Sequence, residues 1–167
     1  MSMTSGKHPS RRQQRFHLKI SIVIAVSVFG FGILGDVSFA GGKRDVAAIE
    51  GFLDHYFSTW SNKELVAYKN CFHPEATIVV LDRSNVPQIS LSRDTFIGTQ
   101  EEAQRKSHVK MREVPLNKQI TVAGTLGQAT VRWKLFKGHH SATGVDLFTL
   151  VLTSGEWKIL HLAVRND

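Results

Sequence analysis

The sequence contains a single cysteine among its 167 residues. Cys71 alone excludes an internal disulfide, and there is no cysteine pair to hold a zinc ion. It lies beside Phe72 in the helical segment "VAYKNCF", where a buried small residue is favoured over a reactive nucleophile. The HxH and HExxH patterns are also missing, so we expect no metal site.

Motifs for phosphate binding and serine hydrolysis are absent as well. The chain has no glycine-rich phosphate loop and no G-x-S-x-G sequence. The formal charge of +7 is uneven, since residues 1–40 hold five Lys and Arg against one acid, whereas the remaining 127 residues hold sixteen bases and thirteen acids. Such a mild excess does not form a nucleic-acid footprint. We therefore expect no nucleic-acid partner and no cofactor.

One apolar run stands at the beginning of the chain. Residues 20–35 read "ISIVIAVSVFGFGILG", sixteen uncharged residues behind the basic stretch "RRQQRFHLK". Small residues follow at Ser38 and Ala40, as a leader peptidase requires. A membrane-spanning helix needs about 20 apolar residues, more than this run supplies. The pattern predicts a signal peptide over 1–40, cleavage after Ala40 and export to the periplasm or the medium; the alternative is a retained leader that anchors the protein in a membrane.

The rest of the chain, residues 41–167, orders its predicted elements as two helices, a strand pair, a third helix and a run of strands. Apolar residues at helical spacing predict the first helix over 45–60. Ser61 and Glu64 form a capping-box pattern for a short second helix, and Ser92 is expected to cap the third. Strand-like runs then follow at 108–114, 118–124, 128–137, 144–152 and 156–164. This order predicts an α+β fold, with helices packed on one curved antiparallel sheet.

This order, together with "CFHPEATIVV" after the second helix and "GVDLFTLVLTSGEWKILHL" near the end, resembles the NTF2-like superfamily. Its members include SnoaL-type polyketide cyclases, limonene-epoxide hydrolases and ketosteroid isomerase. The resemblance covers nearly all of residues 45–165. It implies an NTF2-like cone, in which three N-terminal helices close a curved antiparallel β-sheet around an apolar pocket. It also implies a homodimer formed through exposed sheet surface.

Alignment with ketosteroid isomerase suggests site residues. Tyr56 falls where that enzyme carries its oxyanion-hole tyrosine, and Asp146 falls where it carries a neutral aspartic acid. The enzyme's catalytic base falls at Val80, which cannot take a proton. Asp82 is a possible replacement base because it lies two residues after Val80 and so points to the same side of the strand as Val80. The alternative is that Asp82 is a turn residue in "LDRSN". Tyr56 has a simpler alternative too, a core tyrosine with its hydroxyl at the rim.

Asp146 is the unusual residue of its strand. Alternation places it on the same face as Phe148, where lost hydration favours the neutral carboxyl group and raises its pKa. A neutral Asp146 and Tyr56 would then donate hydrogen bonds to one ligand oxygen. The alternative is an ionised Asp146 at the open end of the strand, paired with Arg132 or Lys134.

The remaining candidates concern the pocket walls and one histidine. His161 has apolar neighbours on both faces of its strand, so it is either a ligand contact or a packed sheet histidine. Walls are expected from four aromatic residues: Phe52, Trp60, Trp133 and Phe148.

Three functions fit these residues. The first is an exported domain that binds a small apolar, oxygen-bearing molecule. The second is an isomerase or cyclase that uses Tyr56 and Asp146 with Asp82 or His161. The third is a homodimeric interaction module with a filled pocket. We favour the first because Val80 replaces the base.

Overall fold

The structure is a computed structural model that describes residues 42–167; the predicted signal peptide and its cleavage site lie outside the described residues. The helices are α1 (Lys43–Ser61), α2 (Leu65–Asn70) and α3 (Arg93–Lys106). The strands are β1 (Phe72–Leu81), β2 (Pro87–Ser92), β3 (Met111–Ala123), β4 (Leu126–Lys137), β5 (His140–Thr153) and β6 (Glu156–Asn166). Within this part of the chain no helix is both long and apolar enough to cross a membrane.

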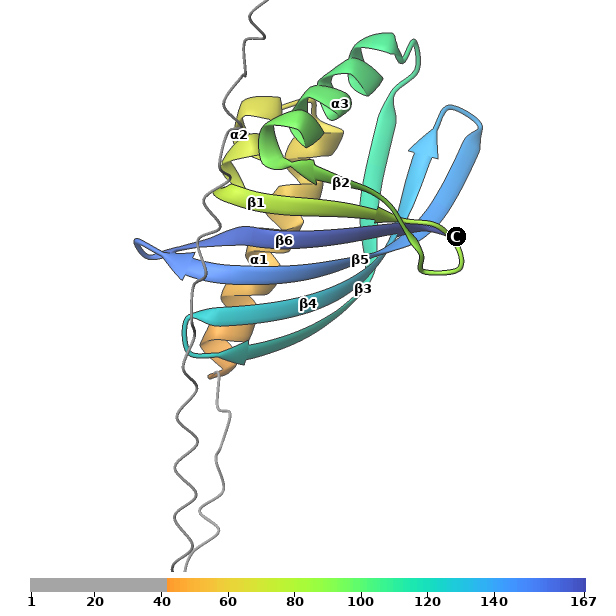
Figure 1. The fold of residues 1–167 in the computed structure, drawn as a ribbon. Helices are drawn as coiled ribbons and strands as arrows, with labels where there is room; N and C mark the ends of the chain where they lie inside the picture. Colours follow the sequence, from red (N-terminus) through yellow and green to blue (C-terminus); the bar gives the residue numbers. More distant parts are fainter. Residues whose placement is uncertain (1–41) are drawn as a thin grey trace, which may run out of the picture. The chain divides into compact units, whose positions relative to one another are not determined.

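All six strands form one sheet in the order β2-β1-β6-β5-β4-β3. The sheet curves and α1 crosses one of its faces, so the predicted α+β cone is confirmed (Figure 1). Neighbouring strands are antiparallel except β1 and β6, which pair in parallel. The last strand therefore lies inside the sheet, between β1 and β5.

The helix α1 supplies much of the core. Its apolar residues recur every three or four positions, which places Ile49, Leu53, Phe57 and Trp60 on one buried face. This face packs against the sheet, most extensively against β3. Burying a side chain of this size contributes about 1.5–3 kcal/mol to folding. The amphipathic pattern of the sequence thus fixes the position of α1.

One predicted cap is confirmed and one is wrong. Ser92 begins α3, and its Oγ accepts a hydrogen bond from the backbone N–H of Thr95 at 3.3 Å. Ser61, by contrast, is the last residue of α1 and caps nothing. Its Oγ donates to the backbone oxygen of Glu113 at 3.0 Å and accepts from the Glu113 N–H at 2.9 Å. The hydroxyl group of Ser61 thus bonds the backbone of β3 instead of capping α2, and α2 begins at Leu65 without a side-chain cap.

The strand boundaries differ from the sequence pattern at β3. The predicted runs 108–114 and 118–124 form a single strand, whose pairing with β4 shifts between Pro115 and Asn117. Proline has no N–H to donate to a sheet, so it is tolerated at an edge strand or at a bulge. β3 is an edge strand, and the shift in pairing accommodates Pro115, so the strand continues past it.

A bulge in β6 changes which of its side chains face the helices. Thr149 and Leu150 are consecutive in β5, but their partners in β6 are His161 and Ile159. β6 therefore carries one extra residue there. Ile159 is fully buried before the bulge and Leu162 is fully buried after it. His161 is consequently turned toward the outer face, away from the helices.

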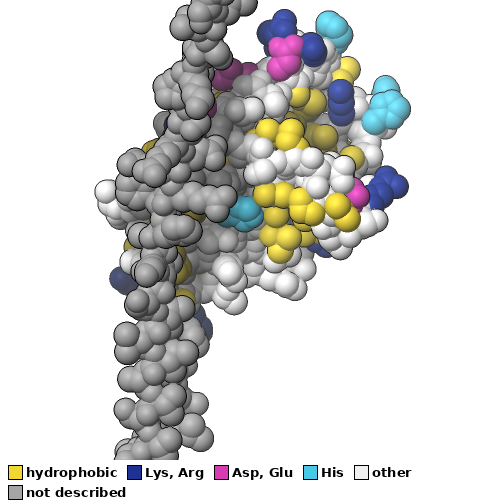
Figure 2. Space-filling model, viewed as in Figure 1, with side chains coloured by type: hydrophobic (Ala, Val, Ile, Leu, Met, Phe, Trp, Pro, Cys, Tyr) yellow, Lys and Arg dark blue, Asp and Glu magenta, His cyan; other side chains and the backbone are white. Residues whose placement is uncertain are grey.

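The outer face of the sheet lies opposite the helices. Hydrophobic side chains gather over part of it (Figure 2). Leu147 of β5 belongs to the exposed hydrophobic residues, at 44% exposure. The homodimer expected from the family resemblance would use such a surface and stays a prediction.

Candidate functional site

A cavity of about 250 Å³ lies between the three helices and the sheet. Aromatic side chains form much of its wall: Tyr56, Trp60, Tyr68, Phe96 and Trp133. Its remaining lining includes two carboxyl groups, those of Glu113 and Asp146. An apolar chamber with a few polar groups is the usual form of a small-molecule site.

Asp146 lies on β5 with its side chain facing this cavity and is only 3% exposed. The indole N–H of Trp133 donates to its Oδ1 at 2.8 Å. Burial raises the pKa of Asp146 from 3.8 to about 7, although the bond from Trp133 acts in the opposite direction. The alternative of an ionised Asp146 at the open end of the strand, paired with Arg132 or Lys134, is wrong, since Asp146 is buried and bonds Trp133 instead.

Gly144 allows the indole of Trp133 to reach Asp146. Trp133 of β4 pairs with Gly144 of β5, and Asp146 lies two positions further along β5. A Cβ atom at position 144 would overlap the Trp133 ring and the backbone oxygen of Arg165. The missing side chain therefore provides the space that the ring occupies.

Glu113 brings a second carboxyl group from β3. Its backbone is held by Ser61 of α1, and its side chain is half-buried. Burial and then the charge of Asp146 raise the pKa of Glu113 from 4.5 to about 8. The two acids lose their protons in coupled steps. Because the Trp133 N–H stabilises the carboxylate of Asp146, Asp146 ionises first and Glu113 keeps its proton longer.

Two tyrosines contribute hydroxyl groups to the same cavity. Tyr68 of α2 donates to the hydroxyl oxygen of Tyr56 at 2.9 Å. Burial raises the pKa of both far above the ordinary value of 10.0, so both are neutral. Since the Tyr56 oxygen accepts the bond from Tyr68, its own proton remains available for another acceptor.

The wall residue Trp60 is fixed by α3. Its indole N–H donates to Gln100 Oε1 at 2.9 Å, and its backbone oxygen accepts from Gln104 Nε2 at 2.7 Å. The ring thus has its polar atom satisfied and presents aromatic surface to the cavity.

The structure therefore brings together four of the residues expected from sequence: Tyr56, Trp60, Trp133 and Asp146. Phe148 lies behind Tyr56 in the core, with ring centroids 5.4 Å apart and edge-to-face geometry. It supports Tyr56 and does not line the cavity.

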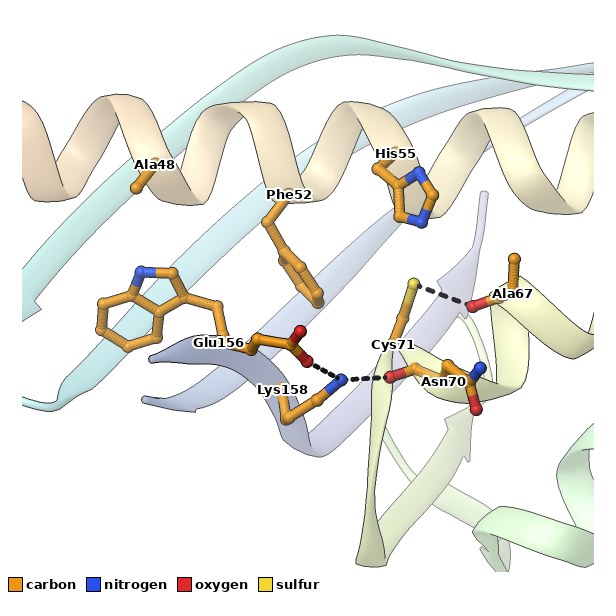
Figure 3. Close-up of a pocket in the computed structure, with 9 residues that line it drawn as sticks. Ala48, Phe52, His55, Ala67, Asn70, Cys71, Glu156 and Lys158 are labelled. Carbon is orange, nitrogen blue, oxygen red and sulfur yellow. Dashed lines mark hydrogen bonds and ion pairs between the residues drawn. The ribbon is translucent and has the colours of Figure 1, made fainter. Parts of the chain in front are cut away.

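Phe52 lines a separate groove of about 590 Å³ beside α1, α2 and the start of β6 (Figure 3). Polar groups there are paired with one another: Lys158 contacts Glu156 at 2.8 Å and the backbone oxygen of Asn70 at 2.9 Å. Burial raises the pKa of Cys71 to about 11, so the thiol stays protonated and unreactive. Phe52 therefore belongs to this groove and does not line the cavity that holds Glu113 and Asp146.

Asp82 and His161 also lie outside the cavity. Asp82 Oδ1 accepts from the backbone N–H groups of Ser84 at 2.8 Å and Val86 at 2.9 Å, which are the contacts of a turn residue. The Nδ1 of His161 lies 2.8 Å from the hydroxyl of Thr77 on the adjacent strand, on the outer face. The turn and the bulge of β6 account for these two positions.

Sequence reasoning missed Glu113 and Tyr68 as site residues. Glu113 lies two residues after the buried Met111 and so shares its face of the strand, a weak signal of an inward-facing acid. Tyr68 lies three residues after Leu65, which is the spacing of one helix face. In residues 42–167 no group of three or more His, Cys, Asp or Glu side chains gathers to hold a metal ion.

Solved structures share this fold at low sequence identity. An NTF2-like protein of unknown function from Pseudomonas putida KT2440 matches with a TM-score of 0.66 and 8% identity, over 74% of this chain and 87% of its own. A "Putative Scytalone Dehydratase" from Novosphingobium aromaticivorans DSM 12444 matches with a TM-score of 0.63 and 16% identity, over 74% and 85%. The beta subunit of the benzoate 1,2-dioxygenase from Burkholderia mallei ATCC 23344 has a TM-score of 0.63 and 15% identity, over 74% and 91%.

These likenesses establish the NTF2-like fold. No curated protein matches the sequence. A family model described as "Putative lumazine-binding" matches residues 44–163, which is most of the chain. The chain therefore belongs to this family and has the NTF2-like fold.

Proposed function

We propose that the domain binds a small, flat, largely apolar molecule that carries an oxygen, and that it does so in the cavity of Tyr56 and Asp146. The observation that carries the proposal is the burial of Asp146 at 3% exposure against an open chamber. Among the described residues only Trp133 bonds its carboxyl group. A buried polar group with spare bonding capacity is costly unless something else satisfies it.

The polar groups suit a carbonyl oxygen. Tyr56 has a proton to donate, and a carboxyl group in its neutral form donates another. Two donors directed at one oxygen bind it and stabilise negative charge on it. The aromatic walls would hold the rest of the ligand.

The size of the chamber limits the ligand. Pockets for drug-sized molecules measure about 300–1,000 Å³, whereas this cavity measures about 250 Å³. It therefore suits one or two fused rings. The description of the family names lumazine, which is a flat, oxygen-bearing ring system of this class.

Binding is tested by titrating the full chain with lumazine and with benzamide, a planar ring with one carbonyl group. Quenching of tryptophan fluorescence reports binding, since Trp60 and Trp133 line the cavity. We expect Tyr56→Phe to weaken binding about tenfold, the equivalent of one hydrogen bond of about 1.4 kcal/mol. Asp82→Asn, outside the cavity, is the control and should leave affinity unchanged. Equal affinity in Tyr56→Phe and the parent would refute the proposal.

A second candidate function is proton transfer. Glu113 and Asp146 share the cavity and differ in how strongly they hold a proton, which is the arrangement of a general acid and base. An enzyme of this kind would exchange hydrogen for deuterium at the carbon beside a carbonyl group of its substrate. Glu113→Gln would abolish that exchange and keep binding. Binding without exchange across a panel of enones supports the first function over the second.

We also propose that the protein is exported, on the strength of the leader pattern over residues 1–40. Expression of the full gene in a bacterial host, followed by amino-terminal sequencing, tests it. Protein from the periplasm or the medium should begin at Gly41. An intact Met1 in the membrane fraction would instead show a retained anchor.

A further inference from the structure

The cavity is acidic on one side and has no basic counterpart. Glu113 and Asp146 belong to its lining, and no Lys, Arg or His of the described residues does. The titratable groups that face Asp146 are Tyr56 from α1, Tyr68 from α2 and Glu113 from β3. The elements α3, β1, β4 and β6 add only uncharged groups: Phe96, Gln100, Val80, Trp133, Leu135, Val164 and Asn166.

We infer that this acidic side binds a positively charged nitrogen, and that the natural ligand is a flat organic cation such as an amidine, a guanidine or a ring-bound amine. The inference rests on the binding function proposed above and specifies the class of its ligand. The Glu113 and Asp146 carboxyl groups face the nitrogen, and Tyr56 faces the oxygen or the ring.

The charge of the cavity favours a cation. One carboxylate in a chamber of low polarity, bonded by a single neutral N–H, retains most of its desolvation cost. A cation offers both the opposite charge and several N–H donors. An amidinium ion has two parallel N–H groups, which match the two oxygens of a carboxylate. It therefore satisfies Asp146 in a way that a neutral ketone cannot.

The aromatic walls of the cavity also favour a cation. The indole N–H groups of Trp60 and Trp133 are already bonded, to Gln100 and to Asp146. What these residues offer a ligand is aromatic surface, and aromatic surface attracts cations. Walls and carboxyl groups thus select the same kind of ligand.

Cation binding is linked to proton release. Glu113 and Asp146 together retain about one proton at neutral pH, and a bound cation favours the ionised form of both. Affinity for a cation therefore rises as the pH rises from 6 to 8.5. Affinity for a neutral carbonyl compound falls over the same range, because the acids lose the protons that they would donate.

The test compares benzamidine with benzamide, which have the same size and shape but differ in charge. The full chain is titrated with each by calorimetry at pH 6 and 8.5, in two buffers with different ionisation enthalpies. We expect benzamidine to bind at least tenfold more tightly than benzamide at pH 8.5. The preference should shrink at pH 6, and the two buffers should reveal protons released on binding.

Variants locate the effect. Asp146→Asn and Glu113→Gln should each bring the two affinities to within about twofold of each other. Glu156→Gln removes an exposed acid in the groove of Figure 3 and should keep the full preference. Glu113→Gln suffices if Asp146→Asn fails to fold.

The possible outcomes distinguish failure of the cation site from failure of the proposed binding function. Benzamide binding without a preference for benzamidine overturns the inference and leaves the proposed function standing. A preference that survives both carboxyl variants also overturns it, since the cation then binds elsewhere. Absence of binding by either compound overturns both. Binding of benzamidine alone supports the acidic subsite and refutes the role of Tyr56 with a carbonyl oxygen.

Discussion

The two acids of the cavity predict that this protein loses stability as the pH rises from 5 to 9. Asp146 has a pKa of about 7 and Glu113 a pKa of about 8 in the folded chain, against ordinary values of 3.8 and 4.5. The folded state therefore binds more protons than the unfolded state in this range. The free energy of unfolding then decreases with increasing pH, and it levels off once both acids are ionised in the folded chain.

The magnitude follows from the pKa values. Between pH 5 and 9, a group whose pKa rises from 3.8 to about 7 on folding accounts for about 3 kcal/mol, at about 1.4 kcal/mol for each pKa unit. Glu113 acts in the same direction. Surface acids with lowered pKa values, such as Asp94 and Glu102, act in the opposite direction at lower pH, as their carboxylates take up protons. A loss of about 3 kcal/mol or more is a large share of the 5–15 kcal/mol that stabilises a typical domain.

Urea unfolding at pH 5, 7 and 9, followed by tryptophan fluorescence, measures this loss. Asp146→Asn is the informative variant, since an asparagine Oδ1 still accepts the bond from Trp133 and carries no charge. It should flatten the pH profile and be more stable than the parent at pH 9. Equal stability of the parent protein at pH 5 and 9 would show that neither acid is desolvated, and the reasoning would be wrong.

Four further variants test the surroundings of the site by urea unfolding. Gly144→Ala should lower the free energy of unfolding by about 3 kcal/mol, because its Cβ would overlap the Trp133 ring; Gly51→Ala, with open space around it on α1, should raise it by up to about 1 kcal/mol. Trp133→Phe removes the donor to Asp146 and should cost about 1–3 kcal/mol at pH 9, with a smaller loss at pH 5. Asp82→Asn should cost less than about 1 kcal/mol, and a larger loss, or lost ligand binding, would contradict a role confined to the turn.

Features set by local rules were predictable from the sequence. The repeat of apolar residues identified α1, and Ser92 marked the start of α3. Strict alternation on β5 placed Asp146 beside Phe148 on the buried face. In each case the signal lies within a few neighbouring residues of one helix or strand, so no distant contact is needed to interpret it.

Features set by distant contacts were not predictable. Ser61 has the pattern of a cap, but the backbone of Glu113, 52 positions away, binds its hydroxyl instead. The extra residue in β6 reverses the facing of the second half of that strand, and nothing in "EWKILHLAV" marks it. Glu113 reads as a surface acid because only the packing of α1 over β3 encloses it. The acidic character of the site was therefore hidden in the sequence.

The parallel pairing of β1 with β6 has a consequence for how the chain acquires its shape. β1 and β2 are made early, yet the only strand that joins them to the other three is β6. During synthesis the two groups of strands stay unconnected until residues 156–166 have left the ribosome. A chain that stops at residue 155 would hold two partial sheets, β1 with β2 and β3 with β4 and β5, that no strand joins.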